Sequence, residues 1–335
     1  MMSDKLAYVS LFRVISMTMI VLYHSLCFYI GIWWYLPSEV IPLWFYLSAP
    51  IVIVGLSFFV FISGFLYSYL YFEKGKYRQM SPFWKGKIRR LIVPYVLWGC
   101  LMVILMPIAF QWTNMYYGIA HLWFLLSLFE LFILIVIINR IASFIPQKWM
   151  GCYSFDVIVL FLSFVSVYLW CSYSTHLCFL SITNTLYYFP FFFAGYLFAK
   201  YKLYELNVVR YSFLFFMIGL ILLFLLSTSI LHDRETLYRI PSLIVTCSTI
   251  ILCRWFCFRY RIIRLISVLD KNSMGIYIFN QFVVFIMLLI PSTNNFLRLH
   301  PYIGPLIIFL VSFVVPWMLS SFFSRTKYLS WMIGV

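Results

Sequence analysis

Long apolar stretches recur along this chain, and they constrain its fold more than any other feature. Each holds about 17–25 residues, enough at a rise of 1.5 Å per residue for a helix to cross a hydrocarbon core about 30 Å thick. We distinguish about ten, the sixth being the weakest: 8–30, 46–72, 91–110, 122–139, 155–171, 185–199, 211–231, 240–257, 273–291 and 302–323. Of the 335 residues, 65% are hydrophobic and only 10% are charged, against about 25% charged in an ordinary soluble domain. The sequence therefore predicts an all-α, polytopic integral membrane bundle of about ten transmembrane helices.

Positive charge is distributed unevenly between the loops of this pattern. If the N-terminus is cytoplasmic, 21 of the 24 Lys and Arg residues fall in cytoplasmic segments or helix ends, and the opposite face keeps Arg234, Arg239 and Arg298. Short loops rich in Lys and Arg stay in the cytoplasm. We therefore expect a multi-pass protein of the cell (inner) membrane with its N-terminus and C-terminus cytoplasmic. Topology and anionic lipid explain the net charge of +15, which indicates no nucleic-acid partner.

The segments between the apolar stretches are short, so any chemistry has to use side chains of the helices. We expect one transmembrane domain, residues 1–335, with no appended soluble domain. The first stretch is long and carries charge, so it should remain as a helix and not be cleaved as a signal peptide. The eight cysteines show no CxxC pair and no metal-ligand spacing, so neither a disulfide framework nor a metal site is expected. No Walker or dinucleotide motif is present, which gives ATP-driven pumping no support.

Two polar residues of the first stretch stand out, because ionisable groups at membrane depth are costly. Arg13 and His24 are eleven positions apart, so on a helix they project from one face about 16 Å apart along the axis. A cation at one end of a face and an imidazole at the other suit an extended anionic ligand. The alternative is that Arg13 snorkels to the lipid headgroups and His24 hydrogen-bonds a neighbouring carbonyl.

Six segments of the chain resemble, in order, the signature segments of the membrane-bound acyltransferase 3 proteins, which O-acylate bacterial glycans and related acceptors. Arg13 and His24, with ten residues between them, are similar to the family's first-helix pair. The other segments are 58–65, ending in Ser-Gly-Phe, the basic 87–95, the Leu-Trp-Phe box within 121–125, the aromatic 189–196, and 273–280. Position 280 is Asn, where many members of the family have His.

The resemblance implies transfer of an acyl group, usually acetyl from cytoplasmic acetyl-CoA, to a hydroxyl presented at the other face of the membrane. The acceptor would be a cell-surface glycan or a lipid-linked sugar. His24 would then act as the general base on that hydroxyl or would carry the acyl group briefly. Imidazole suits either role, because its ordinary pKa of about 6.5 is close to working pH.

The donor site is expected at a basic cytoplasmic mouth, since CoA carries several phosphate charges and Arg is the preferred fork-shaped partner of phosphate. Arg89 and Arg90 are the best candidates, together with Arg13 and, less specifically, Lys87. Plain positive-inside charge is the alternative for all of them except Arg13, and it is the stronger interpretation of Lys87.

Further candidates lie deeper or nearer the outer interface. Glu130 is expected at mid-depth, where it would orient His24 or only lock two helices. An ionised carboxylate there needs a partner such as Arg13 or a polar cavity. His121 and Trp123 are expected near the outer interface, where an aromatic belt is the default explanation but where they could also bind a sugar. Asn280 and Gln281 can supply hydrogen-bond donors and acceptors to the acceptor substrate.

Two other classes of function remain open at this point. A flippase or exporter of lipid-linked saccharide would also be a basic-inside, aromatic-rich bundle with buried polar groups. A glycan polymerase or ligase often has substantial outer loops, and the outer loops here are short. We rank the acyltransferase first and the flippase or exporter second.

Overall fold

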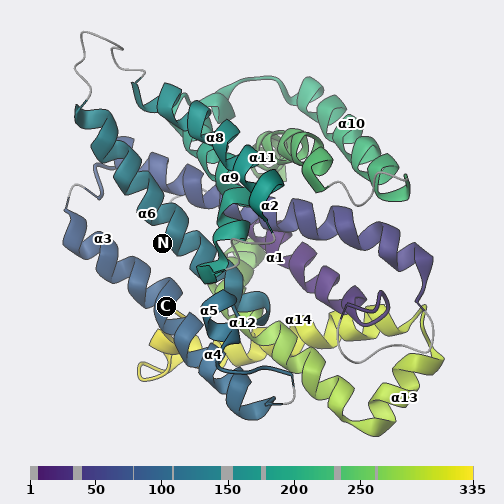
Figure 1. The fold of residues 1–335 in the computed structure, drawn as a ribbon. Helices are drawn as coiled ribbons and strands as arrows, with labels where there is room; N and C mark the ends of the chain where they lie inside the picture. Colours follow the sequence, from purple (N-terminus) through teal and green to yellow (C-terminus); the bar gives the residue numbers. More distant parts are fainter. Residues whose placement is uncertain are drawn as a thin grey trace. The chain divides into compact units, whose positions relative to one another are not determined.

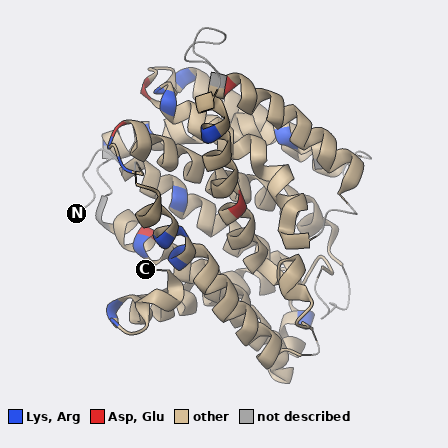
Figure 2. Ribbon diagram, turned by 60° about the vertical axis from the view of Figure 1, so that its left-hand side comes forward, with Lys and Arg blue, Asp and Glu red and all other residues tan. Residues whose placement is uncertain are grey.

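Every regular element in the described part of the computed structural model is a helix (Figure 1). The described residues are 7–32, 40–77, 79–107, 109–144, 154–174, 179–229, 235–260 and 263–334. No strand occurs in these ranges, and charged residues occupy only small parts of the ribbon (Figure 2). The predicted all-α fold class is therefore confirmed.

Contacts divide the chain into two compact units, which are described one at a time. The first unit comprises Met1–Ile62 and Tyr204–Ile333, and the second comprises Ser63–Leu203 and Gly334–Val335. The helices of the first unit are α1 (Ala7–Cys27), the first part of α2 (Pro42–Phe72), α10 (Val209–Thr228), α11 (Arg239–Tyr260), α12 (Ile263–Leu289), α13 (Pro291–Leu299) and α14 (Gly304–Arg325). Those of the second are the rest of α2, α3 (Met80–Lys87), α4 (Val93–Leu105), α5 (Asn114–Tyr117), α6 (Trp123–Phe144), α8 (Ser154–Tyr173) and α9 (Ile182–Lys200). One domain over residues 1–335 stays a prediction.

Among the described residues, nine helices are long and apolar enough to cross a membrane, and they coincide with nine of the ten predicted stretches. Two of them begin about ten residues earlier than predicted. The helix of the third predicted stretch starts at Met80 instead of residue 91, and that of the ninth predicted stretch, α12, starts at Ile263 instead of residue 273. The first early segment, 80–90, holds two Lys and two Arg, and the second, 263–272, holds one of each. Both residue types have good helix propensity, and their long side chains can reach from a helix end to the headgroups.

The remaining predicted stretch, 185–199, forms α9, whose apolar character alone does not mark it as a span. Its direction relative to its neighbours in the second unit does. Ser127 of α6 donates a hydrogen bond of 2.9 Å to Ser181, at the start of α9, and further on Phe132 of α6 packs on Phe192 at 5.4 Å between ring centroids. From the first contact to the second, the residue numbers increase along both helices, so α9 runs parallel to α6. It runs antiparallel to α8, because Lys200 at the end of α9 donates to Asp156 at the start of α8, and Thr183 at the start of α9 donates to the oxygen of Ser174 just after α8. We infer that α9 crosses the membrane with α6 and α8.

Burial lets α9 carry polar residues that lower its hydropathy. Eleven of its 19 residues are buried, whereas only four of the 20 residues of α10 are. A helix surrounded by other helices can carry Asn and Thr, because protein replaces lipid around them.

The first unit supports the same number of crossings. Residues 13 and 24 of α1 contact residues 270 and 280 of α12 respectively, so α1 and α12 are parallel. Parallel spans need an odd number of crossings between them along the chain. With α9 counted there are seven (α2, α3–α4, α6, α8, α9, α10 and α11), and without it there would be six.

Gly64, in the Ser-Gly-Phe segment, lets α2 and α9 approach closely within the second unit. A Cβ atom built on Gly64 would lie only 1.9 Å from the backbone oxygen of Phe192 and 3.2 Å from the backbone nitrogen of Tyr196. Small residues are the usual device by which membrane helices bring their backbones together. Two segments of the family resemblance, 58–65 and 189–196, therefore meet at this glycine.

Candidate functional site

The two outstanding residues of the first stretch both contact the same helix, α12, within the first unit. Arg13 contacts Asp270 at one end of the α1–α12 interface, and His24 contacts Asn280 at the other. An apolar cluster that includes Met17 of α1 is packed with α12 between these ends. The interface is therefore apolar in its middle and polar at two places, which lie about 16 Å apart along one face of α1.

His24 and Asn280 form a buried polar pair. Their exposed fractions are 7% and 0%, and His24 Nδ1 lies 2.5 Å from Asn280 Oδ1. The amide nitrogen of Asn280 donates to the backbone oxygens of Tyr277, at 2.7 Å, and of Ile276, at 3.2 Å. Asn280, expected to bind the acceptor, thus directly contacts the imidazole. Gln281, the next residue, is also buried.

Arg13 is held by a carboxylate that sequence reasoning missed. Arg13 Nε lies 3.0 Å from Asp270 Oδ1, with side-chain exposures of 27% and 8%, and Ser10 Oγ donates a hydrogen bond of 2.8 Å to Asp270 Oδ2. One signal could have revealed Asp270: it precedes Asn280 by ten residues, almost the spacing of Arg13 and His24. The cost of a charged group at membrane depth is lowered when an opposite charge and a hydroxyl meet it.

Glu130, in the second unit, has a different partner from the one expected. Its Oε2 accepts a hydrogen bond of 2.6 Å from Thr185 Oγ1 of α9. Arg13 has a carboxylate partner of its own in the first unit, Asp270, and a pairing of Arg13 with Glu130 stays a prediction. The contact with Thr185 ties α6 to α9, as the helix-locking interpretation of Glu130 requires.

The basic residues proposed for the donor differ in their surroundings. Arg89 and Arg90 are exposed and lie on a π-helical segment, Ile88–Ile92, between α3 and α4. The π-helical register is seen in the Val93 N–H, which donates to the Ile88 oxygen, and such segments are rare and often functional. Lys87 instead places Nζ 3.3 Å from the ring centroid of Phe132, where a cation–π contact stabilises it.

The residues expected near the outer interface are packed among aromatic side chains of the second unit. Trp123 stacks on Tyr188 of α9, with ring centroids 6.0 Å apart and an interplanar angle of 21°. His121 is buried, with an exposed fraction of 6%. The structure thus groups the predicted residues by unit: Arg13, His24, Asn280 and Gln281 in the first, and Lys87, Arg89, Arg90, His121, Trp123 and Glu130 in the second.

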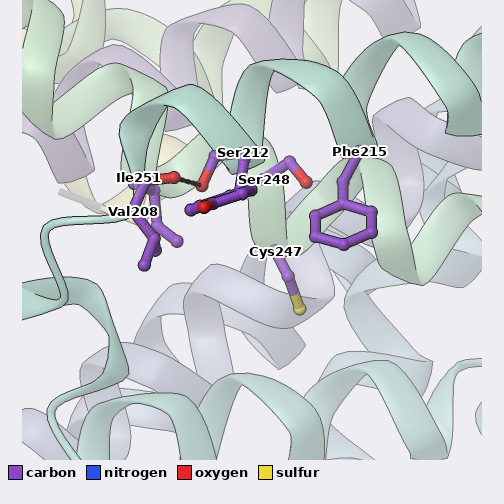
Figure 3. A pocket seen from close by; sticks show the side chains of 7 residues that line it. Val208, Ser212, Phe215, Cys247, Ser248 and Ile251 are labelled. Carbon is purple, nitrogen blue, oxygen red and sulfur yellow. Dashed lines mark hydrogen bonds between the residues drawn. The ribbon is translucent and has the colours of Figure 1, made fainter.

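A pocket of about 350 Å³ lies between α10 and α11 of the first unit (Figure 3). Its lining is mostly apolar, and one of its few polar groups, Ser212 Oγ, donates a hydrogen bond of 3.0 Å to the Val208 oxygen. Of the described residues that line it, none is a predicted site residue. In the described ranges, no group of three or more His, Cys, Asp or Glu side chains is placed to hold a metal ion.

Comparison with known proteins bears on the whole chain. No curated protein and no solved structure matches it. The family model described as "Acyltransferase domain" (Acyl_transf_3) matches residues 6–321, a range that begins just before α1 and ends within α14. The chain, with its bundle of membrane-crossing helices and its α1–α12 interface, therefore belongs to the acyltransferase 3 family.

Proposed function

We propose that the protein is a membrane O-acetyltransferase that moves an acetyl group from cytoplasmic acetyl-CoA to a hydroxyl of a cell-surface or lipid-linked saccharide. One observation carries the proposal beyond family membership. A single buried helix interface in the first unit holds an arginine near one end and a histidine near the other, and both are fixed by polar partners.

The reaction needs a group that accepts a proton from the acceptor hydroxyl. His24 takes that proton as the hydroxyl oxygen attacks the thioester carbonyl, the carbon–sulfur bond breaks, and the CoA thiolate leaves and is protonated. If His24 instead carries the acetyl group, its nitrogen attacks the thioester carbonyl, and the CoA thiolate leaves and takes up the imidazole proton. The acceptor hydroxyl then attacks the acetyl-imidazole, the carbon–nitrogen bond breaks, and the leaving imidazole takes the hydroxyl proton. Both routes place the same imidazole beside the acceptor hydroxyl and the thioester, and burial of His24 limits hydrolysis of the donor.

Donor binding requires cations at the cytoplasmic side. Arg13 has its Nε edge against Asp270, and its side chain remains 27% exposed, so its terminal nitrogens are the part available to a phosphate of the donor. Arg89 and Arg90 are exposed on their π-helical segment and are proposed to bind CoA phosphates. We assign both termini to the cytoplasm and the protein to the cell membrane on the positive-inside rule.

The test is His24→Ala in the full-length protein, reconstituted in vesicles with labelled acetyl-CoA and a glycan acceptor. Acetyl transfer should fall by about 10²–10⁴, the usual contribution of a general base, with at least as large a loss for a covalent role. Binding of acetyl-CoA should be preserved, because the imidazole acts about 16 Å along the helix from Arg13.

The matched control is His300→Ala, which removes an exposed imidazole from the end of α13 and should leave transfer unchanged. A loss of only a few-fold in His24→Ala would remove His24 from the reaction. A wild-type protein that moves lipid-linked saccharide across the bilayer without transferring acetyl would favour the flippase or exporter instead.

A further inference from the structure

We propose that Asn280 is a positioning residue that fixes the tautomer of His24, so that Nδ1 carries the proton and Nε2 is the nitrogen that acts on the acceptor hydroxyl. The catalytic consequence rests on the proposed function, but the tautomer itself does not. It follows from the contacts of two buried side chains in the first unit.

The orientation of the Asn280 amide is determined by its own helix. Its NH₂ group donates to two backbone oxygens, of Tyr277 at 2.7 Å and of Ile276 at 3.2 Å. A flipped amide would place Oδ1 against these two oxygens, where only acceptors would meet. The NH₂ group therefore belongs on the carbonyl side, and Oδ1 belongs on the His24 side.

That orientation determines where the imidazole proton lies. Asn280 Oδ1 is an acceptor only, and it is 2.5 Å from His24 Nδ1, so Nδ1 has to donate. The other neutral tautomer would bring two lone pairs together at this distance. Both side chains are buried, at 7% and 0% exposure, so bulk water does not relieve that repulsion. Two buried acceptors that face each other without a hydrogen-bond donor are costly. In the neutral Nδ1–H tautomer, Nε2 holds the lone pair that can take a proton.

The amide also suits its surroundings in the membrane. A carboxylate that accepts from Nδ1 would also orient the ring, but it would add a buried charge to an interface that already carries the Arg13–Asp270 ion pair. Asn280 orients the imidazole without a charge. The base and the residue that orients it come from two parallel helices, α1 and α12, so the tautomer depends on their packing.

The test is ¹⁵N NMR of the full-length protein labelled at histidine, with the His24 signals assigned by their loss in His24→Ala. In the wild type, Nδ1 should show the chemical shift of a protonated nitrogen and Nε2 that of an unprotonated one. Asn280→Leu should move His24 toward the Nε2–H tautomer. Asn280→Asp keeps the acceptor oxygen toward His24 and, with its second oxygen protonated so that it donates to the backbone oxygens of Tyr277 and Ile276, should keep Nδ1 protonated.

Asn272→Leu is the matched control. Asn272 is also a buried Asn of α12 whose NH₂ group donates to a backbone oxygen one turn earlier, that of Val268 at 2.9 Å, but its Oδ1 accepts from the Ser320 hydroxyl instead of from an imidazole. The His24 signals should be unchanged in this variant. A wild-type His24 protonated at Nε2, or a tautomer unaffected by Asn280→Leu, would overturn the proposal.

Acetyl transfer measured on the same variants separates this proposal from the proposed function. Asn280→Leu should lower kcat by about tenfold or more at unchanged KM for acetyl-CoA, because the base, and not the donor site, is disturbed. If the NMR result is as expected but neither Asn280→Leu nor His24→Ala affects transfer, the tautomer stands and the assigned role of His24 fails.

Discussion

Replacing Gly64 by Ala should destabilise the second unit, because the added methyl group would meet backbone and not a flexible side chain. The new Cβ would lie 1.9 Å from the Phe192 oxygen, and ordinary contact begins at 3.4 Å. Part of α2 and α9 would have to separate by the difference between these distances. Overpacking of a well-packed site costs about 1–3 kcal/mol and sometimes more, and the upper end is expected here because neither backbone can rotate away.

The assay is thermal unfolding of purified protein in detergent, with Gly86→Ala as the matched control. Gly86 is also a helical glycine, on α3, but a Cβ there meets nothing within 4 Å. Its replacement should be neutral or stabilise the helix by about 0.5–1 kcal/mol, since Gly costs that much relative to Ala in a helix interior. If Gly64→Ala unfolds at the same temperature as the wild type and as Gly86→Ala, the close approach of α2 and α9 is wrong.

Three further predictions follow from the ion pair, the basic π-helical segment and the parity of the crossings. Asp270→Leu should destabilise the protein by about 3–5 kcal/mol by leaving Arg13 without its counter-ion, and Arg13→Met added to it should restore stability in thermal unfolding but not acetyl transfer. Replacing Arg89 and Arg90 together by Ala should weaken acetyl-CoA binding in a salt-dependent way, with folding intact. An unchanged affinity in titrations would mean that both residues serve only as positive-inside charge. Accessibility tags at the two termini and in 73–88 should report the cytoplasm, and tags near 114 and 296 the outer face; a C-terminus on the outer face would contradict an even number of crossings.

The sequence by itself determined the class of fold and the positions of the spans. Lipid offers no hydrogen bonds to the backbone, so an apolar stretch of membrane length has to be a helix. The 3.6-residue period then places Arg13 and His24 on one face without any tertiary information. Even the weakest stretch, now α9, was recognisable as a helix of this kind.

Only the tertiary structure decided which residues meet. Asn280 is 256 residues from His24 along the chain, and neither Asp270 as the partner of Arg13 nor Thr185 as the partner of Glu130 was anticipated. A membrane helix is apolar on nearly all sides, because lipid and protein neighbours are equally apolar, so its pattern does not mark the face that another helix covers. Helix pairing in lipid is decided by close backbone approach, as at Gly64, and by a few polar contacts, and these exist only once the helices have packed.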